Sequence, residues 1–70
     1  MESMNFAKRL KELRAEKGIY QKDLAEILHV APSAVSAWEI GRNEPSNEML
    51  IKISEFFGVT VDYLLGKTDY

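Results

Sequence analysis

The chain has 70 residues, a formal net charge of −2, no cysteine and a single histidine. A chain of this length forms one domain and has no room for a large pocket beside its core. The missing cysteines exclude disulfides and thiolate metal sites, and no apolar run approaches the roughly 18 residues that cross a bilayer. We therefore expect one soluble cytoplasmic domain over residues 1–70, with no cofactor, metal ion, small-molecule ligand or membrane partner.

Charge is unevenly distributed along the chain. Seven of the nine lysine and arginine residues precede Pro45, and the C-terminal third carries more acidic than basic side chains. Proteins that bind nucleic acids are usually basic, so the net charge of −2 argues against that role. The concentration of basic residues before Pro45 is nevertheless compatible with a local basic face.

The spacing of apolar residues predicts helices along the whole chain. Phe6, Leu10 and Leu13 fall on one face of a first helix, with Asn5 as its N-cap and Gly18 as its stop signal. No stretch shows sustained two-residue alternation, so we predict no strand.

Helix-starting residues divide the rest of the chain. A second helix has an apolar set from Leu24 to Leu28 and ends before Pro32. Proline is favoured at the first position of a helix, so a third helix is predicted to begin at Pro32. Ser46 and Thr60 are expected to cap a fourth helix and a short fifth one. The last residues, 67–70, are predicted to fray.

Residues 21–40 form the most informative stretch, QKDLAEILHVAPSAVSAWEI. It contains two short helices joined by about three residues, and such a tight turn makes the helices cross steeply. Ala25 supplies a small side chain at the crossing. The inward-facing residues are predicted to be Leu24, Leu28, Val30, Val35 and Trp38. This arrangement is typical of a helix-turn-helix motif, whose second helix enters a DNA major groove.

Four segments extend the pattern over nearly the whole chain: LKELRAEKG at 10–18, QKDLAEIL at 21–28, VSAWEIGRNEP at 35–45 and ISEFFGVTVDYLLG at 53–66. In order, spacing and loop length, they resemble the Cro/C1-type (XRE-like) helix-turn-helix repressors of phages and bacteria. The resemblance implies an all-α, five-helix, lambda-repressor-like fold that binds operator DNA, usually as a dimer.

The resemblance also implies site residues. Base-facing positions of the recognition helix would be Ala31, Pro32, Ser33, Ser36, Ala37 and Ile40. Phosphate contacts would come from Gln21, Arg42 and Asn43, and a structural ion pair from Arg14 and Glu39.

Three features depart from the family pattern. His29 stands where the motif turn usually has glycine, and Tyr20 stands where the family has a Ser or Thr cap. The predicted recognition helix has no Arg, Lys, Asn or Gln at its outward positions, so two-bond recognition of guanine or adenine is excluded there. Ile40 is the least expected outward residue: it either contacts DNA, at a thymine methyl or the sugar–phosphate edge, or folds back onto the core.

Two questions stay open from the sequence. The first is whether Val59, Val61 and Tyr63 complete a small core or form a dimer contact.

The second question is the function. The chain is predicted to be a sequence-specific transcriptional repressor that binds a two-fold operator as a homodimer. The alternative is a protein-interaction module of the same fold, such as an antitoxin or antirepressor partner. No Ser/His/Asp set or metal-ligand set is present, so we do not expect an enzyme.

Overall fold

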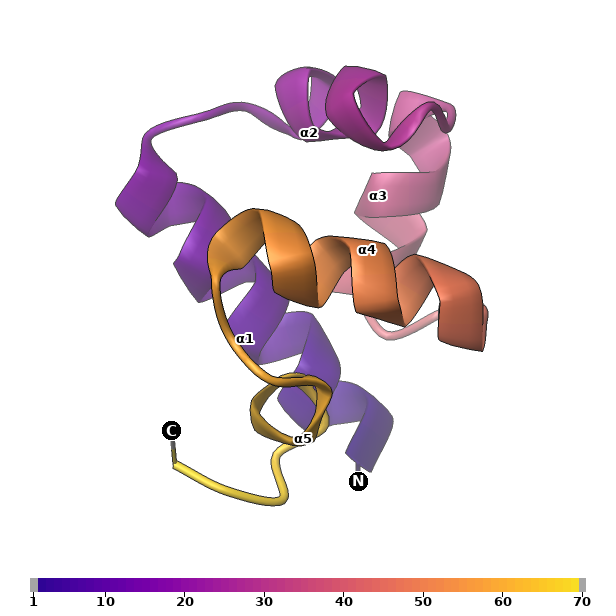
Figure 1. The fold of residues 1–70 in the computed structure, drawn as a ribbon. Coiled ribbons are helices and arrows are strands. Elements are labelled where there is room, and N and C mark those ends of the chain that lie inside the picture. The colour runs from indigo at the N-terminus through magenta and orange to yellow at the C-terminus, as the bar shows by residue number, and fades with distance from the viewer. Residues whose placement is uncertain (1, 70) are drawn as a thin grey trace.

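The computed structural model describes residues 2–69, which form five α-helices joined by short turns and contain no strand. The helices are α1 (Glu2–Lys17), α2 (Gln21–Leu28), α3 (Pro32–Glu39), α4 (Asn47–Phe57) and α5 (Val61–Leu64). In Figure 1, α2 and α3 lie at one end of the molecule, α4 crosses its middle, and α5 lies at the opposite end. The predicted all-α, five-helix fold is confirmed. No helix within residues 2–69 is long and apolar enough to cross a membrane.

Most helix ends follow the predicted signals. Ser46 Oγ accepts a hydrogen bond from the Met49 backbone N–H at 3.2 Å, and Thr60 Oγ1 accepts one from the Tyr63 N–H at 3.0 Å. Pro32 is the first residue of α3, where a missing backbone N–H costs nothing. The predicted starts of α3, α4 and α5 are therefore confirmed.

The start of α1 differs from the prediction. The helix begins at Glu2, so Asn5 lies inside it and is not its N-cap. Asn5 instead lies against the turn that follows α5, because a Cβ atom built on Gly66 would come within 2.7 Å of Asn5 Cβ. Gly66 also has a φ of +81°, so the approach of this turn to α1 requires glycine for both reasons.

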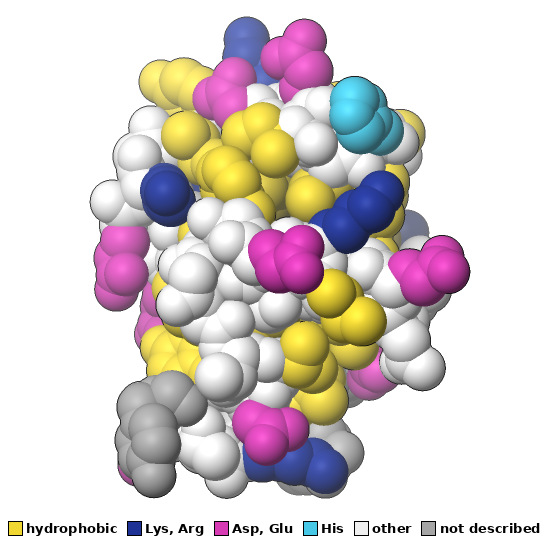
Figure 2. All heavy atoms as spheres, viewed as in Figure 1, with side chains coloured by type: hydrophobic (Ala, Val, Ile, Leu, Met, Phe, Trp, Pro, Cys, Tyr) yellow, Lys and Arg dark blue, Asp and Glu magenta, His cyan; other side chains and the backbone are white. Residues whose placement is uncertain are grey.

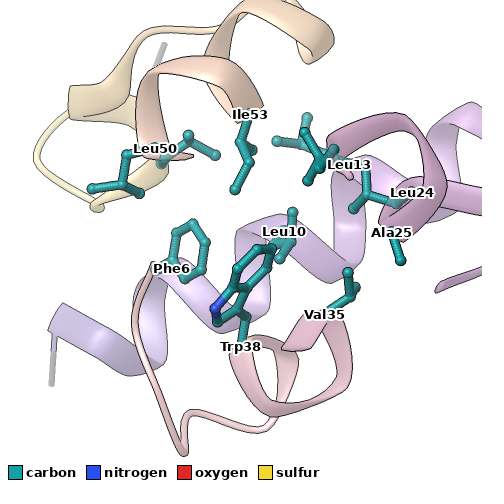
Figure 3. Packing of buried hydrophobic residues seen from close by; sticks show 11 residues of the cluster. Phe6, Leu10, Leu13, Leu24, Ala25, Val35, Trp38, Leu50 and Ile53 are labelled. Carbon is teal, nitrogen blue, oxygen red and sulfur yellow. The ribbon is translucent and has the colours of Figure 1, made fainter. Parts of the chain in front are cut away.

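One apolar cluster joins the helices, and Figure 3 shows its side chains converging from α1, α2, α3 and α4. Trp38 is only 6% exposed, which confirms its packing role. Each fully buried Leu, Ile or Phe side chain contributes about 1.5–3 kcal/mol relative to exposure. The cluster consists of Phe6, Leu10, Leu13, Leu24, Ala25, Leu28, Val35, Trp38, Leu50, Ile53 and Leu64.

Ile27 does not belong to this cluster, although it falls within the apolar set predicted for the second helix. It is 44% exposed, because the burial of α2 is centred on Leu24, Ala25 and Leu28 and leaves Ile27 at the edge of that face.

The segment after α5 is held against α1 by one arginine. Arg9 Nη1 donates hydrogen bonds to the carbonyl oxygens of Tyr63 at 2.9 Å and Thr68 at 2.7 Å. Arg9 Nη2 also lies 3.5 Å from the carboxylate of Asp69. Three of the four residues predicted to fray, 67–69, therefore follow a path fixed by α1, and residue 70 lies outside the described residues.

Candidate nucleic-acid interface

The turn between α2 and α3 has the geometry that the motif requires. His29 adopts the left-handed conformation with φ 60° and ψ 44°. The backbone N–H groups of His29 and Val30 donate to the carbonyls of Glu26 at 3.2 Å and Ala25 at 2.9 Å, which closes the end of α2. A left-handed non-glycine residue costs roughly 1–2 kcal/mol, and histidine is among the residues that tolerate this conformation.

Small and branched side chains bring α2 and α3 into close contact. Ala25 is 1% exposed and Val35 is fully buried, and both lie in the cluster where the two helices meet (Figure 3). Trp38 and Leu24 are also buried there, whereas Val30 packs on the cluster while only partly covered. The inward face of α3 is thereby fixed to the core, and its opposite face is left at the surface.

The outward face of α3 carries the residues expected to face DNA bases. Ala31, Pro32, Ser33 and Ile40 are exposed, whereas Ser36 and Ala37 are half-buried. At 100° per residue, Ser33, Ser36 and Ala37 form one stripe along α3, and Ile40, the C-cap that follows Glu39, extends this stripe. Ile40 is 60% exposed, so it does not fold back onto the core. The longest polar groups on this stripe are the two serine hydroxyls.

A buried carboxylate connects the three helices that build the motif. Glu39, on α3, is 6% exposed. Its Oε2 accepts a hydrogen bond from Arg14 Nε at 2.7 Å, and its Oε1 accepts one from Arg14 Nη2 at 3.1 Å and one from Gln21 Nε2 at 3.0 Å. Arg14 Nη1 also donates to the Ile19 carbonyl at 2.9 Å. The structure thus brings together the predicted ion pair and adds Gln21 to it.

The hydrogen bonds of this network keep the carboxylate charged. Burial by itself would raise the pKa of Glu39, but the hydrogen bonds from Arg14 and Gln21, and attraction to Arg14 and Lys11, lower that pKa below its usual value. The hydrogen bond to Glu39 in turn raises the pKa of Arg14. Both partners are therefore ionised at neutral pH.

Gln21, predicted to contact a phosphate, opens α2 and is half-buried. One of its two amide N–H groups is directed to Glu39. The second N–H has no acceptor among the described residues, so the bond to Glu39 orients the group without using all its donors. Arg14, Tyr20, Gln21 and Lys22 line a shallow hollow at this helix start.

Asp23 compensates for the unusual residue at the N-cap of α2. The side chain of Tyr20 makes no capping hydrogen bond and is 71% exposed. The Asp23 carboxylate instead accepts a hydrogen bond from the Tyr20 backbone N–H at 2.8 Å. Asp23 was not singled out from the sequence, but an acidic residue three positions after a helix start is half of a capping box and was a usable signal.

Arg42 and Asn43, the other predicted phosphate contacts, lie in the exposed loop that follows α3. The Arg42 backbone N–H donates to the Ala37 carbonyl at 2.9 Å, so the backbone at Arg42 is tied to the end of α3. The loop therefore carries a guanidinium and a carboxamide next to the outward face of α3.

The predicted dimer residues Val59, Val61 and Tyr63 are half-buried and pack against the core. The Arg9 guanidinium lies 4.2 Å from the centroid of the Tyr63 ring, so it occupies one face of that ring. Each of the three side chains contributes to the core and still has exposed atoms. Their role in a dimer stays a prediction.

The side chains on the face that carries α2 and α4 do not form a basic stripe. Figure 2 shows acidic and basic groups intermingled on this face with hydrophobic atoms between them, and the exposed ring of the single histidine near one edge. On this face, attraction to phosphates would depend on individual lysine and arginine side chains.

Together these features define a helix-turn-helix protein with an exposed second helix. Residues 10–64 match the family model described as "Helix-turn-helix". The chain belongs to the Cro/C1-type branch of this DNA-binding family of transcription regulators.

Similar proteins include a transcriptional activator and a repressor. The chain is 47% identical over 63 residues to the HTH-type transcriptional activator BcrR of Enterococcus faecalis, covering 90% of this chain and 31% of the relative. It is 39% identical over 66 residues to the HTH-type transcriptional regulator ImmR of Bacillus subtilis (strain 168), covering 94% and 52%. It is 43% identical over 62 residues to the Repressor protein CI of Enterobacteria phage phi80, covering 89% and 26%. The chain spans between about a quarter and about half of the length of these relatives.

Proposed function

We propose that this chain binds operator DNA through α3 and represses transcription by occupying the operator. The supporting observation is the outward face of α3, which is exposed while its inward face is held by Val35, Trp38 and the Glu39 network. A rigid helix that stands out from a small domain fits the width of a major groove. No chemical step is needed for this activity.

Phosphate contacts would supply most of the affinity. In this proposal the second N–H of Gln21, the guanidinium of Arg42, the carboxamide of Asn43 and the backbone N–H groups at the start of α2 bind phosphate oxygens on either side of the groove. Arg42 and Asn43 are exposed, and Gln21 is already oriented by Glu39.

We further propose a homodimer on a two-fold operator, with Val59, Val61 and Tyr63 in the contact. Two-fold dimers of this kind bind half-sites about one helical turn, roughly 34 Å, apart. Sedimentation with and without operator DNA tests this part. A single domain bound to an isolated half-site at every protein concentration would contradict it.

A salt series in a DNA-binding assay tests the proposal as a whole. Affinity for duplex DNA is expected to fall steeply and linearly on logarithmic axes as salt rises, because each phosphate contact releases counterions. Footprinting on the DNA beside the gene should show a protected palindrome. A transcription reporter downstream of that palindrome is expected to lose expression, and a gain would show activation instead.

A second function is favoured by one specific observation, the exposed Ile40 beside short outward side chains on α3. The same surface would suit a protein-interaction module, such as an antitoxin or antirepressor partner. Binding through such a surface depends weakly on salt, because apolar contacts release no counterions. Salt-insensitive binding to a protein, with no affinity for DNA, would favour this function over the first.

A further inference from the structure

The side chains on the outward face of α3 limit which DNA bases this helix could recognise. This inference rests on the proposed function. Two-bond recognition of guanine uses Arg or Lys, and that of adenine uses Asn or Gln. The stripe of Ser33, Ser36, Ala37 and Ile40 contains none of these residues.

The largest side chain on this stripe is also the most apolar. Ile40 is 60% exposed and makes no contribution to the core cluster. Ala37 lies one turn before it and is half-buried. In the major groove the only apolar group on a base edge is the 5-methyl of thymine. The apolar end of the stripe, Ala37 and Ile40, therefore has one natural counterpart among the four bases if it is directed at the groove.

We infer that α3 selects a thymine-containing half-site through thymine 5-methyl groups, with Ile40 making the principal contact and Ala37 a smaller one. The serine hydroxyls donate to or accept from several base edges, so they add affinity with little discrimination. The apolar contacts then carry most of the base preference.

The length of the stripe limits the number of bases involved. Ser33 and Ile40 are seven residues apart, which is roughly 10 Å along the helix axis at 1.5 Å per residue. This distance corresponds to about three base-pair steps along one DNA strand. Within these base pairs, the half-site is therefore expected to contain one or two positions where thymine is preferred for its methyl group, one facing Ile40 and one facing Ala37.

The test begins with selection of binding sequences from a randomised duplex library by the full chain. Each thymine of the selected half-site is then replaced by uracil, which keeps every hydrogen-bonding group and removes only the methyl. Affinity is expected to fall about fourfold for each contacted methyl, since burial of one such group is worth about 0.8 kcal/mol.

A protein variant assigns the contact to its side chain. The Ile40→Ala protein is expected to bind the thymine and uracil duplexes equally at the position that Ile40 contacts. Uracil at the position facing Ala37 should still weaken its binding. Ile51→Ala is the matched control, because Ile51 is 50% exposed on α4 and lies outside the proposed interface. Circular dichroism melting of both variants checks that they fold.

The outcomes separate this inference from the function on which it rests. Selection of a sequence whose binding is unchanged by uracil at every position would overturn the methyl contact and leave DNA binding intact. A uracil effect that persists unchanged in Ile40→Ala would overturn the role of Ile40. Failure to bind any duplex, at low as well as high salt, would overturn the proposed function itself.

Discussion

Glu39 is the residue that ties α3 to the two helices before it. It connects α3 to Arg14 on α1 and to Gln21 on α2 through hydrogen bonds of 2.7–3.1 Å. A buried ion pair adds little net stability compared with well-packed apolar side chains, because both charges lose their hydration. Its value here is geometric, since the bonds hold the orientation of α3 and of the Gln21 amide together.

Arg14→Ala and Glu39→Ala are each expected to lower the free energy of unfolding by roughly 3 kcal/mol, because either change strands a partly buried charge. The double variant should lose less than the sum of the two single losses. Urea unfolding of the four proteins measures this coupling. Losses that add without a coupling term would mean that the two side chains do not interact in solution.

Acid is expected to weaken the fold through Glu39. The pKa of Glu39 is lower in the folded protein than in the unfolded chain, so its contribution to stability is present above the usual pKa of about 4.3 and is lost as pH falls through the folded value. Glu39→Gln should be less stable at neutral pH and should lose less stability between pH 6 and pH 3, a range chosen to bracket about 4.3. Parallel stability curves for the two proteins would contradict this assignment.

The turn between α2 and α3 carries strain at one residue. His29 is exposed and has a φ of 60°, so its side chain adds strain without adding packing. His29→Gly is expected to raise the free energy of unfolding by up to about 1 kcal/mol, the strain relieved minus the extra freedom of glycine in the unfolded chain. His29→Val should lower it, because a β-branched residue is disfavoured in this conformation. Thermal melts of the two variants measure the direction of each stability change. A glycine variant that is less stable than the original protein would contradict the argument.

In helix-turn-helix motifs the N-terminal residues of the second helix contact base edges. Ser33 lies in the first turn of α3, on its exposed face. Ser33→Gln adds a side chain that makes two hydrogen bonds to adenine, so adenine should gain about 1–3 kcal/mol of preference at the facing base pair. The fold should tolerate glutamine, which is the better helix former. Selection from a randomised operator library measures the preference. An unchanged preference in a folded, binding-competent variant would show that Ser33 faces away from the bases.

Elements whose boundaries depend on local chemistry were predictable from sequence. Pro32, Ser46 and Thr60 start helices, and the structure bears each of them out, because capping and proline effects act within one turn. The start of α1 was not predicted correctly. Asn5 has the side chain of an N-cap, but the residues before it are also helical. Asn5 instead lies against Gly66, a contact with the far end of the chain that local sequence does not encode.

Contacts between distant side chains were less predictable. Gln21 donates a hydrogen bond to Glu39, 18 positions away. Arg9 donates hydrogen bonds to the carbonyls of Tyr63 and Thr68, 54 and 59 positions away. Apolar periodicity does not encode which long polar side chain reaches which acceptor. The pairing of Arg14 with Glu39 was expected only because the sequence resembles a family in which these positions face each other.

The charge of the whole molecule determines how the proposed DNA binding would depend on salt. The net charge is −2, and Figure 2 shows both signs mixed on the face that carries α2 and α4. Long-range steering toward DNA is weak for such a distribution. In the proposed complex, affinity would therefore depend on local phosphate contacts, each of which would have a measurable share of the salt dependence.

Arg42→Ala provides the sharpest test of this view. A guanidinium in the exposed loop after α3 suits phosphate binding, so its loss should weaken binding to every sequence about equally and lower the salt slope by about one unit. Lys67→Ala is the matched control, because it changes net charge by the same amount in the segment after α5, and α5 lies at the end of the molecule opposite α2 (Figure 1). If both variants lowered the slope equally, overall charge and not a local contact would control binding. If Arg42→Ala instead changed the preferred base at one operator position, Arg42 would contact a base and not a phosphate.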